Sequence, residues 1–217
     1  MKIAKKVKFC GLTRPADVAA AVQAGADAIG LVFYPPSPRA VDIAQAKTLA
    51  SGVPAFVSVV ALVVNISDEQ LVEIANAVPF DVIQFHGDET AADCQRQAKL
   101  VNKRWIKALR IDATCHDAAK IFAMTEQFAQ AGAAAILLDA YHADKFGGTG
   151  ERFDWSLIDG DLPLPVILAG GLTVENVAQT ADLPIYAVDV SGGIEQAHGI
   201  KDAQKMQDFI KNLNNHH

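Results

Sequence analysis

Short apolar runs alternate with stretches of helical periodicity along almost the whole chain. Each run is about four to eight residues long, is rich in β-branched residues and is bounded by glycine, proline or polar residues, which is typical of buried strands. The predicted strands lie at residues 6–10, 28–33, 57–64, 82–86, 104–110, 134–139, 166–169 and 186–190.

Helix signals occupy the segments between these runs. Thr13 and Pro15 are expected to begin the first helix and Gly25 to end it. Ser67 and Gln70 have the spacing of a capping box for the third helix. The other predicted helices lie at residues 41–50, 89–98, 114–131, 154–158, 173–181 and 202–213.

This alternation predicts an α/β fold, with a single (β/α)8 TIM barrel domain over residues 1–217. An open, doubly wound sheet is the alternative, and it normally carries its glycine-rich phosphate loop after the first strand. Here the first strand ends at Cys10-Gly11, and the glycine pairs come last. The order of these loops therefore favours a barrel with C-terminal phosphate-binding loops.

The seventh and eighth predicted strands both end in glycine pairs. Glycine lets the backbone approach a ligand closely, and free N–H groups can then face an anion. We therefore expect a phosphorylated small molecule as the ligand. The residues predicted to bind its phosphate are Gly170, Gly171, Ser191, Gly192 and Gly193.

Composition narrows the class of protein further. A hydrophobic content of 51% suits parallel strands covered by helices. The net charge of -6 argues against broad binding to nucleic acid or to anionic membranes. No apolar run is long enough to span a bilayer, and the N-terminus lacks the pattern of a signal peptide. Three widely spaced cysteines favour a reducing compartment, so we expect a cytoplasmic protein.

Two candidate catalytic residues stand at strand ends. Cys10 ends the first strand, where a thiol can act as a base or nucleophile if its pKa is lowered; a small buried hydrophobic residue is an equally good interpretation. Cys94 and Cys115 fall in helical segments and are expected to be buried. Asp139 ends an apolar strand, where desolvation would raise its pKa and suit it to acid catalysis, unless it caps the next loop.

Four more polar residues are candidates for substrate binding. Arg39 follows a proline-stiffened turn, and its guanidinium suits a carboxylate or phosphate. Gln84 and His86 are in phase on one strand and should face the same side, where His86 either binds substrate or is structural. Asp189 either orients a sugar hydroxyl or caps the glycine loop.

Other features are less specific. The glycines at 147–150 indicate a mobile loop or a close approach to ligand, and a plain flexible turn is the alternative. No set of histidine, cysteine and aspartate has the spacing of metal ligands. The chain also lacks a Walker A loop and a G-x-S-x-G motif.

Taken in order, the strand-end motifs resemble those of the phosphoribosylanthranilate isomerase family from end to end. One departure is the sequence after the eighth strand, where many relatives have Ser-Ser-Gly and this chain has Ser191-Gly192-Gly193, which predicts the loss of one hydroxyl contact to phosphate. The motifs include Lys8-Phe-Cys-Gly-Leu-Thr13, Ser37-Pro-Arg39, Gln84-Phe-His-Gly87, Leu137-Leu-Asp139, Gly147-Gly-Thr-Gly150, Leu168-Ala-Gly-Gly-Leu172 and Val188-Asp-Val-Ser-Gly-Gly-Ile-Glu195.

The resemblance implies an Amadori rearrangement in tryptophan biosynthesis, the third step from chorismate. N-(5'-phosphoribosyl)anthranilate would become 1-(2-carboxyphenylamino)-1-deoxyribulose 5-phosphate, with Asp139 as the acid, Cys10 as the base and Arg39 binding the anthranilate carboxylate. It implies no cofactor and no metal. The expected partner is this small molecule alone, without nucleic acid or membrane, in a monomer or homodimer.

Three rival functions stay open at this stage. A sugar-phosphate epimerase would be expected to carry metal-binding histidines and aspartates at its strand ends, which are scarce here. Indole-3-glycerol-phosphate synthase would be expected to carry catalytic lysines there, whereas Lys107 lies in mid-strand. A non-catalytic sugar-phosphate binding protein would need neither Cys10 nor Asp139.

Overall fold

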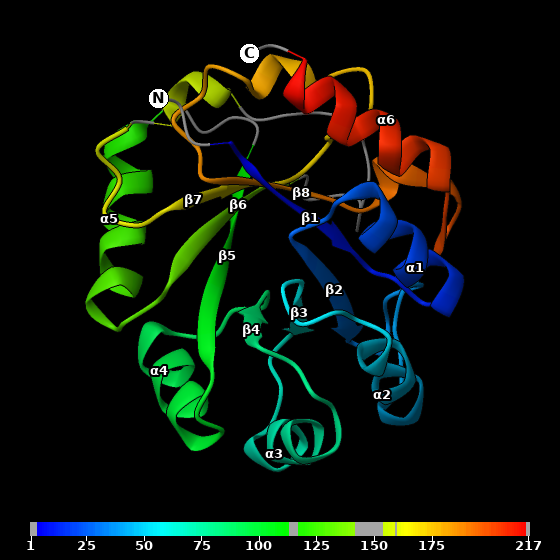
Figure 1. Cartoon of the computed structure of the whole chain (residues 1–217). Helices are drawn as coiled ribbons and strands as arrows, with labels where there is room; N and C mark the ends of the chain where they lie inside the picture. The colour runs from blue at the N-terminus through cyan, green and yellow to red at the C-terminus, as the bar shows by residue number, and fades with distance from the viewer. Residues whose placement is uncertain (1–3, 113–116, 142–153, 159, 216–217) are drawn as a thin grey trace.

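The computed structural model describes residues 4–112, 117–141, 154–158 and 160–215. Its eight parallel strands follow one another around a closed barrel (Figure 1), which confirms the predicted fold. All eight predicted strands are present, with ends that differ by one or two residues at most. The strands are β1 (Lys6–Cys10), β2 (Ala28–Phe33), β3 (Ser58–Val63), β4 (Val82–Phe85), β5 (Arg104–Asp112), β6 (Ala135–Tyr141), β7 (Val166–Leu168) and β8 (Ala187–Val190).

Helices surround the barrel, and their ends follow local sequence signals. Gly25 takes a left-handed conformation (φ 96°) at the end of the first helix, as expected of a C-terminal glycine. Ser67 and Gln70 form both bonds of the predicted capping box. The α-helices are α1 (Pro15–Ala24), α2 (Ile43–Ser51), α3 (Asp68–Ala77), α4 (Ala91–Leu100), α5 (Ala118–Gln130) and α6 (Ala203–Asn214).

Two predicted helices are wrong. The segments 154–158 and 173–181 contain only the 3-10 turns η1 (Trp155–Leu157) and η2 (Val177–Thr180). In the second segment, the backbone bonds from Gln179 to Asn176 and from Ala181 to Ala178 span three residues rather than four, so the chain forms a 3-10 turn.

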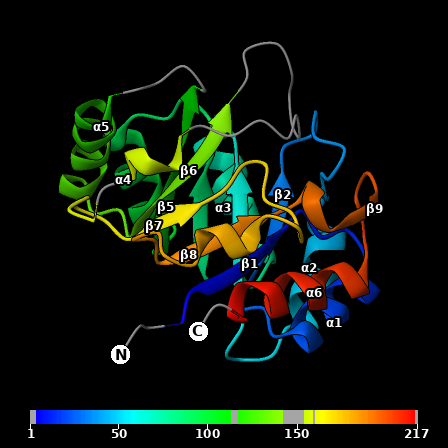
Figure 2. The same cartoon turned by 90° about the horizontal axis from the view of Figure 1, so that it is seen from above.

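A small hairpin after β8 was not predicted. The 3-10 turn η3 (Gly192–Ile194) leads into β9 (Glu195–Ala197), which pairs with β10 (Ile200–Lys201). Figure 2 shows α6 beside α1, where it completes the outer layer of helices. None of the helices in the described part of the chain is long and apolar enough to cross a membrane.

Alternate residues of each strand pack on different sides of the barrel wall. Phe9 of β1 faces outward and packs edge-on against Phe209 of α6, with ring centroids 6.1 Å apart. Ile106, Leu137 and Ile167 belong to a separate cluster inside the barrel. Because side chains alternate along a strand, residues in phase with the inner cluster point into the barrel or its mouth. Those at the carboxyl ends are Cys10, Gln84, Asp139 and Asp189.

Candidate functional site

One wall of the barrel mouth is apolar and carries the Cys10 thiol. Cys10 clusters with Val32 and Leu62, and the partly buried Tyr34 and Val64 pack against them. These residues come from the carboxyl ends of the first three strands and from the loops that follow. A wall of this kind suits a flat aromatic group, which buries apolar area against it.

The Asp139 carboxylate is held by two residues that the sequence also selected. The His86 Nε2 atom lies 3.2 Å from Asp139 Oδ2, and Gln84 Nε2 lies 2.9 Å from His86 Nδ1. Gln84 and His86 therefore face the same side of the barrel, as predicted from their phase. With the amide in this orientation Nδ1 accepts a hydrogen bond, so the proton on Nε2 is directed at the carboxylate.

Gln84 itself is fully buried beneath the mouth. Its Oε1 atom has no hydrogen-bond partner among the described residues. By contrast, the side chain of His86 is 22% exposed and that of Asp139 is 28% exposed, so a ligand can reach both. Gln84 thus acts on the mouth through His86.

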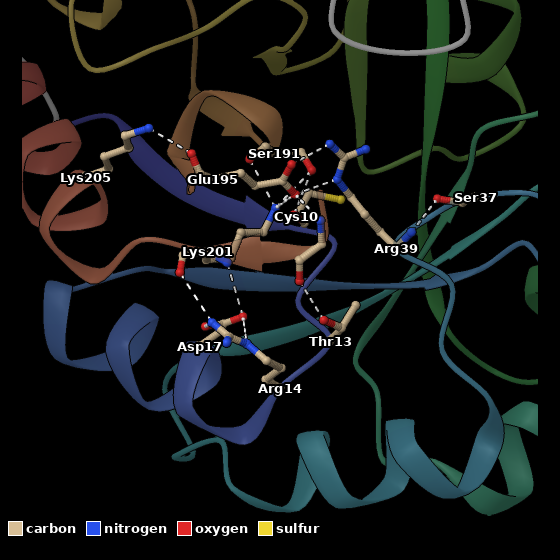
Figure 3. A network of polar contacts seen from close by, with 11 residues as sticks. Cys10, Thr13, Arg14, Asp17, Ser37, Arg39, Ser191, Glu195, Lys201 and Lys205 are labelled. Carbon is tan, nitrogen blue, oxygen red and sulfur yellow. Dashed lines mark hydrogen bonds and ion pairs between the residues drawn. The ribbon is translucent and has the colours of Figure 1, made fainter. Parts of the chain in front are cut away.

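Arg39 is fixed by a carboxylate that the sequence analysis did not select. Its Nε and Nη2 atoms donate to the two oxygens of Glu195, at 2.7 and 2.8 Å. Figure 3 shows Arg39, Glu195 and Lys201 converging next to Cys10. Burial opposes the charge of Glu195, but hydrogen bonds from Arg39 and Lys201 outweigh it and lower the pKa of this carboxyl.

This pairing leaves one edge of the guanidinium for a ligand. No described residue accepts from Arg39 Nη1, so Nη1 and the second Nη2 proton form a free fork. The stem of Arg39 packs on the turn after β1, where a Cβ added to Gly11 (φ +72°) would lie 2.5 Å from Arg39 Cδ. The fork is thereby fixed next to Cys10.

The loops that carry the two glycine pairs approach each other closely. Gly170 and Gly171 both adopt left-handed conformations, with φ of 78° and 67°. A Cβ on Gly193 would lie 1.9 Å from the Leu172 carbonyl oxygen, so only glycine lets the loops after β7 and β8 meet. Gly192 begins a 3-10 turn, where the first N–H groups have no acceptor within the turn.

The hydroxyl of Ser191, one of the residues predicted to bind phosphate, forms two hydrogen bonds within the protein. Its Oγ donates to the Cys10 carbonyl at 2.9 Å and accepts from Lys201 Nζ at 3.1 Å. The hydroxyl therefore ties the loop after β8 to the end of β1.

Asp189 forms a buried ion pair with Lys8, in addition to any role at the mouth. Its Oδ1 lies 2.8 Å from Lys8 Nζ, and the two side chains are only 9% and 6% exposed. Near this pair, burial raises the pKa of the Cys10 thiol; Lys8 opposes that shift and Asp189 adds to it. The lowered thiol pKa that would favour a ready-made thiolate is therefore not found.

The structure also locates residues from several other predictions. Lys107 faces away from the mouth and pairs with Glu89 at 2.7 Å, so it does not supply a strand-end lysine. Cys94 is buried, as expected of a helical cysteine. Cys115, the glycines at 147–150 and the terminal 216–217 lie outside the described residues. Within the described part, no three His, Cys, Asp or Glu side chains are grouped to hold a metal ion.

Lys8, Glu195 and Lys201 belong to this site but were not among the predicted residues. A usable signal existed for Lys8, since it precedes Cys10 by two residues in an apolar strand and so shares its face. Glu195 and Lys201 lie on the unpredicted hairpin, and their charges gave no indication of burial.

Comparison with known proteins relates this chain to one family. The model of the family described as "N-(5'phosphoribosyl)anthranilate (PRA) isomerase" matches residues 7–212. A protein of this name from Pseudomonas putida (strain W619) is 51% identical over 211 residues, which cover 94% of this chain and 95% of the relative.

Solved structures agree. The phosphoribosyl anthranilate isomerase of Thermotoga maritima is similar with a TM-score of 0.84 and 34% identity, over 96% of this chain and 98% of that one. Another structure of such an isomerase, in complex with reduced 1-(o-carboxyphenylamino)-1-deoxyribulose 5-phosphate, has a TM-score of 0.81 and 33% identity over the same shares of the two chains.

Proposed function

The chain belongs to the N-(5'-phosphoribosyl)anthranilate isomerase family, and we propose that it converts N-(5'-phosphoribosyl)anthranilate to 1-(2-carboxyphenylamino)-1-deoxyribulose 5-phosphate in tryptophan biosynthesis. The observation that carries this proposal is the placement of Cys10 and Asp139, which both project from the inner face of the barrel at its carboxyl end. A base and an acid on different strands of one mouth can act on two atoms of one bound sugar.

The two ends of the substrate have matching binding groups. The free fork of Arg39 suits the anthranilate carboxylate, and the adjoining wall of Cys10, Val32 and Leu62 suits its ring. The phosphate would lie on N–H groups of the paired glycine loops, as predicted for Gly170, Gly171, Gly192 and Gly193. Binding at both ends can align the reacting carbons between acid and base.

We propose that Asp139 donates a proton to the ring oxygen of the ribose. The C1–O bond then breaks, and the lone pair of the anthranilate nitrogen forms an iminium with C1. After the transfer Asp139 is a carboxylate, and the Nε2–H of His86 is already directed at its Oδ2. Gln84 and His86 would thus stabilise the form that Asp139 takes once the ring has opened.

Cys10 would complete the rearrangement as a thiolate. The iminium acidifies the C2–H bond, so Cys10 removes this proton and the electron pair forms the C1–C2 double bond of an enolamine. Loss of the enol O–H proton and protonation of C1 then give the ketone. The substrate nitrogen accepts the electrons and regains its lone pair, so the scheme needs no cofactor.

Turnover of freshly prepared phosphoribosylanthranilate tests this function directly. The full chain is expected to abolish the fluorescence of the substrate far faster than its spontaneous decay, in buffer without added metal or cofactor. A preparation of the double variant Cys10→Ser, Asp139→Asn provides the matched control. Tight binding of the substrate without turnover would favour the non-catalytic binding protein instead.

Arg39→Ala is expected to raise KM by roughly 10- to 100-fold and to change kcat less, because a charge-assisted bond to the substrate carboxylate is lost. Initial rates over a range of substrate concentrations measure both constants. Arg96→Ala is the matched control, since Arg96 is an exposed arginine on α4 that pairs with Asp68. An unchanged KM in Arg39→Ala would contradict the carboxylate assignment.

Other features of the protein stay predictions. They are the single-domain organisation of residues 1–217, the cytoplasmic location and the choice between monomer and homodimer. Direct contacts of His86 and Asp189 with the sugar hydroxyls also stay predictions.

A further inference from the structure

Inside the barrel lies a charged pair that the proposed chemistry does not use. Lys8 of β1 and Asp189 of β8 are register partners on adjacent strands, and their side chains are almost fully buried. The neighbouring interior positions are mostly aliphatic, such as Ala187 and Ile167. A buried charge is costly unless it has a partner of opposite charge, and here Lys8 and Asp189 are each other's partners.

The Cys10 thiol shares this site with the pair. Cys10 follows Lys8 by two residues, so both project from the inner face of β1. A Cβ added to Gly30 on the adjacent strand would lie 2.7 Å from Cys10 Sγ and 3.1 Å from Lys8 Nζ. Thiol and ammonium therefore border the same small space, which exists because residue 30 has no side chain.

The other cations near Cys10 are already bound elsewhere. Lys201 on β10 is fully buried and directs its three donors at the Ser191 carbonyl, the Ser191 hydroxyl and Glu195. Arg39 is bound to Glu195 through Nε and Nη2. Lys8 donates to Asp189, and a hydrogen bond between Lys8 and the Cys10 thiol also favours the charge of Lys8. An ammonium has three donors, so Lys8 can also serve the thiolate.

We propose that Lys8 is the counter-ion of the Cys10 thiolate and that Asp189 competes with Cys10 for this charge. With Lys8 and Asp189 both ionised, the buried group of three is neutral only while Cys10 keeps its proton. Without the Asp189 charge, the neutral arrangement becomes a Lys8 ammonium facing a Cys10 thiolate. The pair therefore sets how readily the proposed base forms, and this importance for catalysis rests on the proposed function.

The directions in which the pKa values of Lys8 and Cys10 are shifted agree with this geometry. Burial opposes the charge of Lys8, but Asp189 and Cys10 both favour it, and the pKa of Lys8 is raised as a result. For Cys10, burial raises the pKa, Lys8 and Lys201 lower it, and Asp189 raises it. Neutralising Lys8 should therefore raise the pKa of the Cys10 thiol, and neutralising Asp189 should lower it.

The pH dependence of Cys10 alkylation tests the proposal without any substrate. Iodoacetamide is added to the full chain at a series of pH values, and the modified Cys10 peptide is quantified by mass spectrometry. Because only the thiolate reacts, the midpoint of the curve of alkylation rate against pH reports the thiol pKa. Asp189→Asn should move this midpoint down by about 1–3 pH units, and Lys8→Met should move it up, with slower alkylation at pH 8.

Matched controls come from a second buried ion pair. Lys107 and Glu89 are as deeply buried as Lys8 and Asp189, but Lys107 packs against Phe128 on the outer side of the barrel wall, away from Cys10. Lys107→Met and Glu89→Gln should leave the Cys10 midpoint unchanged, although each also breaks a buried pair. This separates an electrostatic effect from a general loosening of the barrel.

Opposite shifts in the two variants support the proposal. Shifts in the same direction, or shifts no larger than those of the controls, overturn it. If Lys8→Met does not fold, Asp189→Asn decides alone, and a midpoint that is unchanged or higher counts against the proposal. Failure of the proposed function would show up elsewhere, as normal turnover in Cys10→Ser.

Discussion

Cys10→Ser is expected to lower kcat by roughly 10²–10⁴-fold and to leave the fold intact, because a serine hydroxyl cannot serve as the base at neutral pH. The side chain is 6% exposed and contacts Val32 and Leu62 at the mouth, so a hydroxyl of similar size can occupy its place. Initial rates with saturating phosphoribosylanthranilate measure the effect.

Cys94→Ser is the matched control for this experiment. Cys94 is the other cysteine in the described residues; it is fully buried on α4, and burial raises its pKa to about 12. It touches none of the site residues, so its replacement should leave kcat near normal. Turnover by Cys10→Ser at the same rate as Cys94→Ser would show that Cys10 is not the base.

A loss of roughly 10²–10⁴-fold in kcat is likewise expected for Asp139→Asn, since an amide cannot protonate the ring oxygen of the ribose. The amide has nearly the same shape as the acid and can still accept a hydrogen bond from His86 Nε2. Substrate binding should therefore change little. The test is a comparison of kcat with the dissociation constant of the unreacted substrate.

Asp88→Asn provides the control, because Asp88 is an exposed carboxylate, also close to the end of β4, that pairs with Arg110. It should leave kcat near normal, since its carboxylate is exposed and accepts from Arg110 rather than from His86. If Asp139→Asn retained full activity, another group would have to open the ring, and the role of His86 as its partner would fail with it.

The strands of the barrel were predictable because each depends on a short, local pattern. β1 and β2 begin and end where the apolar runs do. The capping box at Ser67 and the glycine after α1 are likewise set by neighbouring residues. The segment 173–181 has the periodicity of a helix, but its backbone bonds from Gln179 to Asn176 and from Ala181 to Ala178 span three residues, as in a 3-10 turn.

Members of the candidate site were also predictable, but their partners were not. Position at a strand end selected Cys10, Arg39, His86 and Asp139, because parallel strands deliver their carboxyl ends to one mouth. The pairing of Arg39 with Glu195 joins residues 156 positions apart, through a hairpin that gave no strand pattern. Likewise Asp189, expected at the rim, has its charge taken up by Lys8 within the barrel.

The amino-acid sequence by itself determined the order of strands, the end of the barrel that bears the site, and the residue types available for acid and base. These follow from local periodicity and from the chirality of parallel strand connections. Only the tertiary structure decided which charges compensate one another and how the thiol of Cys10 is disposed to ionise. The reason is that electrostatic energies depend on burial and separation in space, and closing the barrel brings together β1 and β8 from opposite ends of the chain.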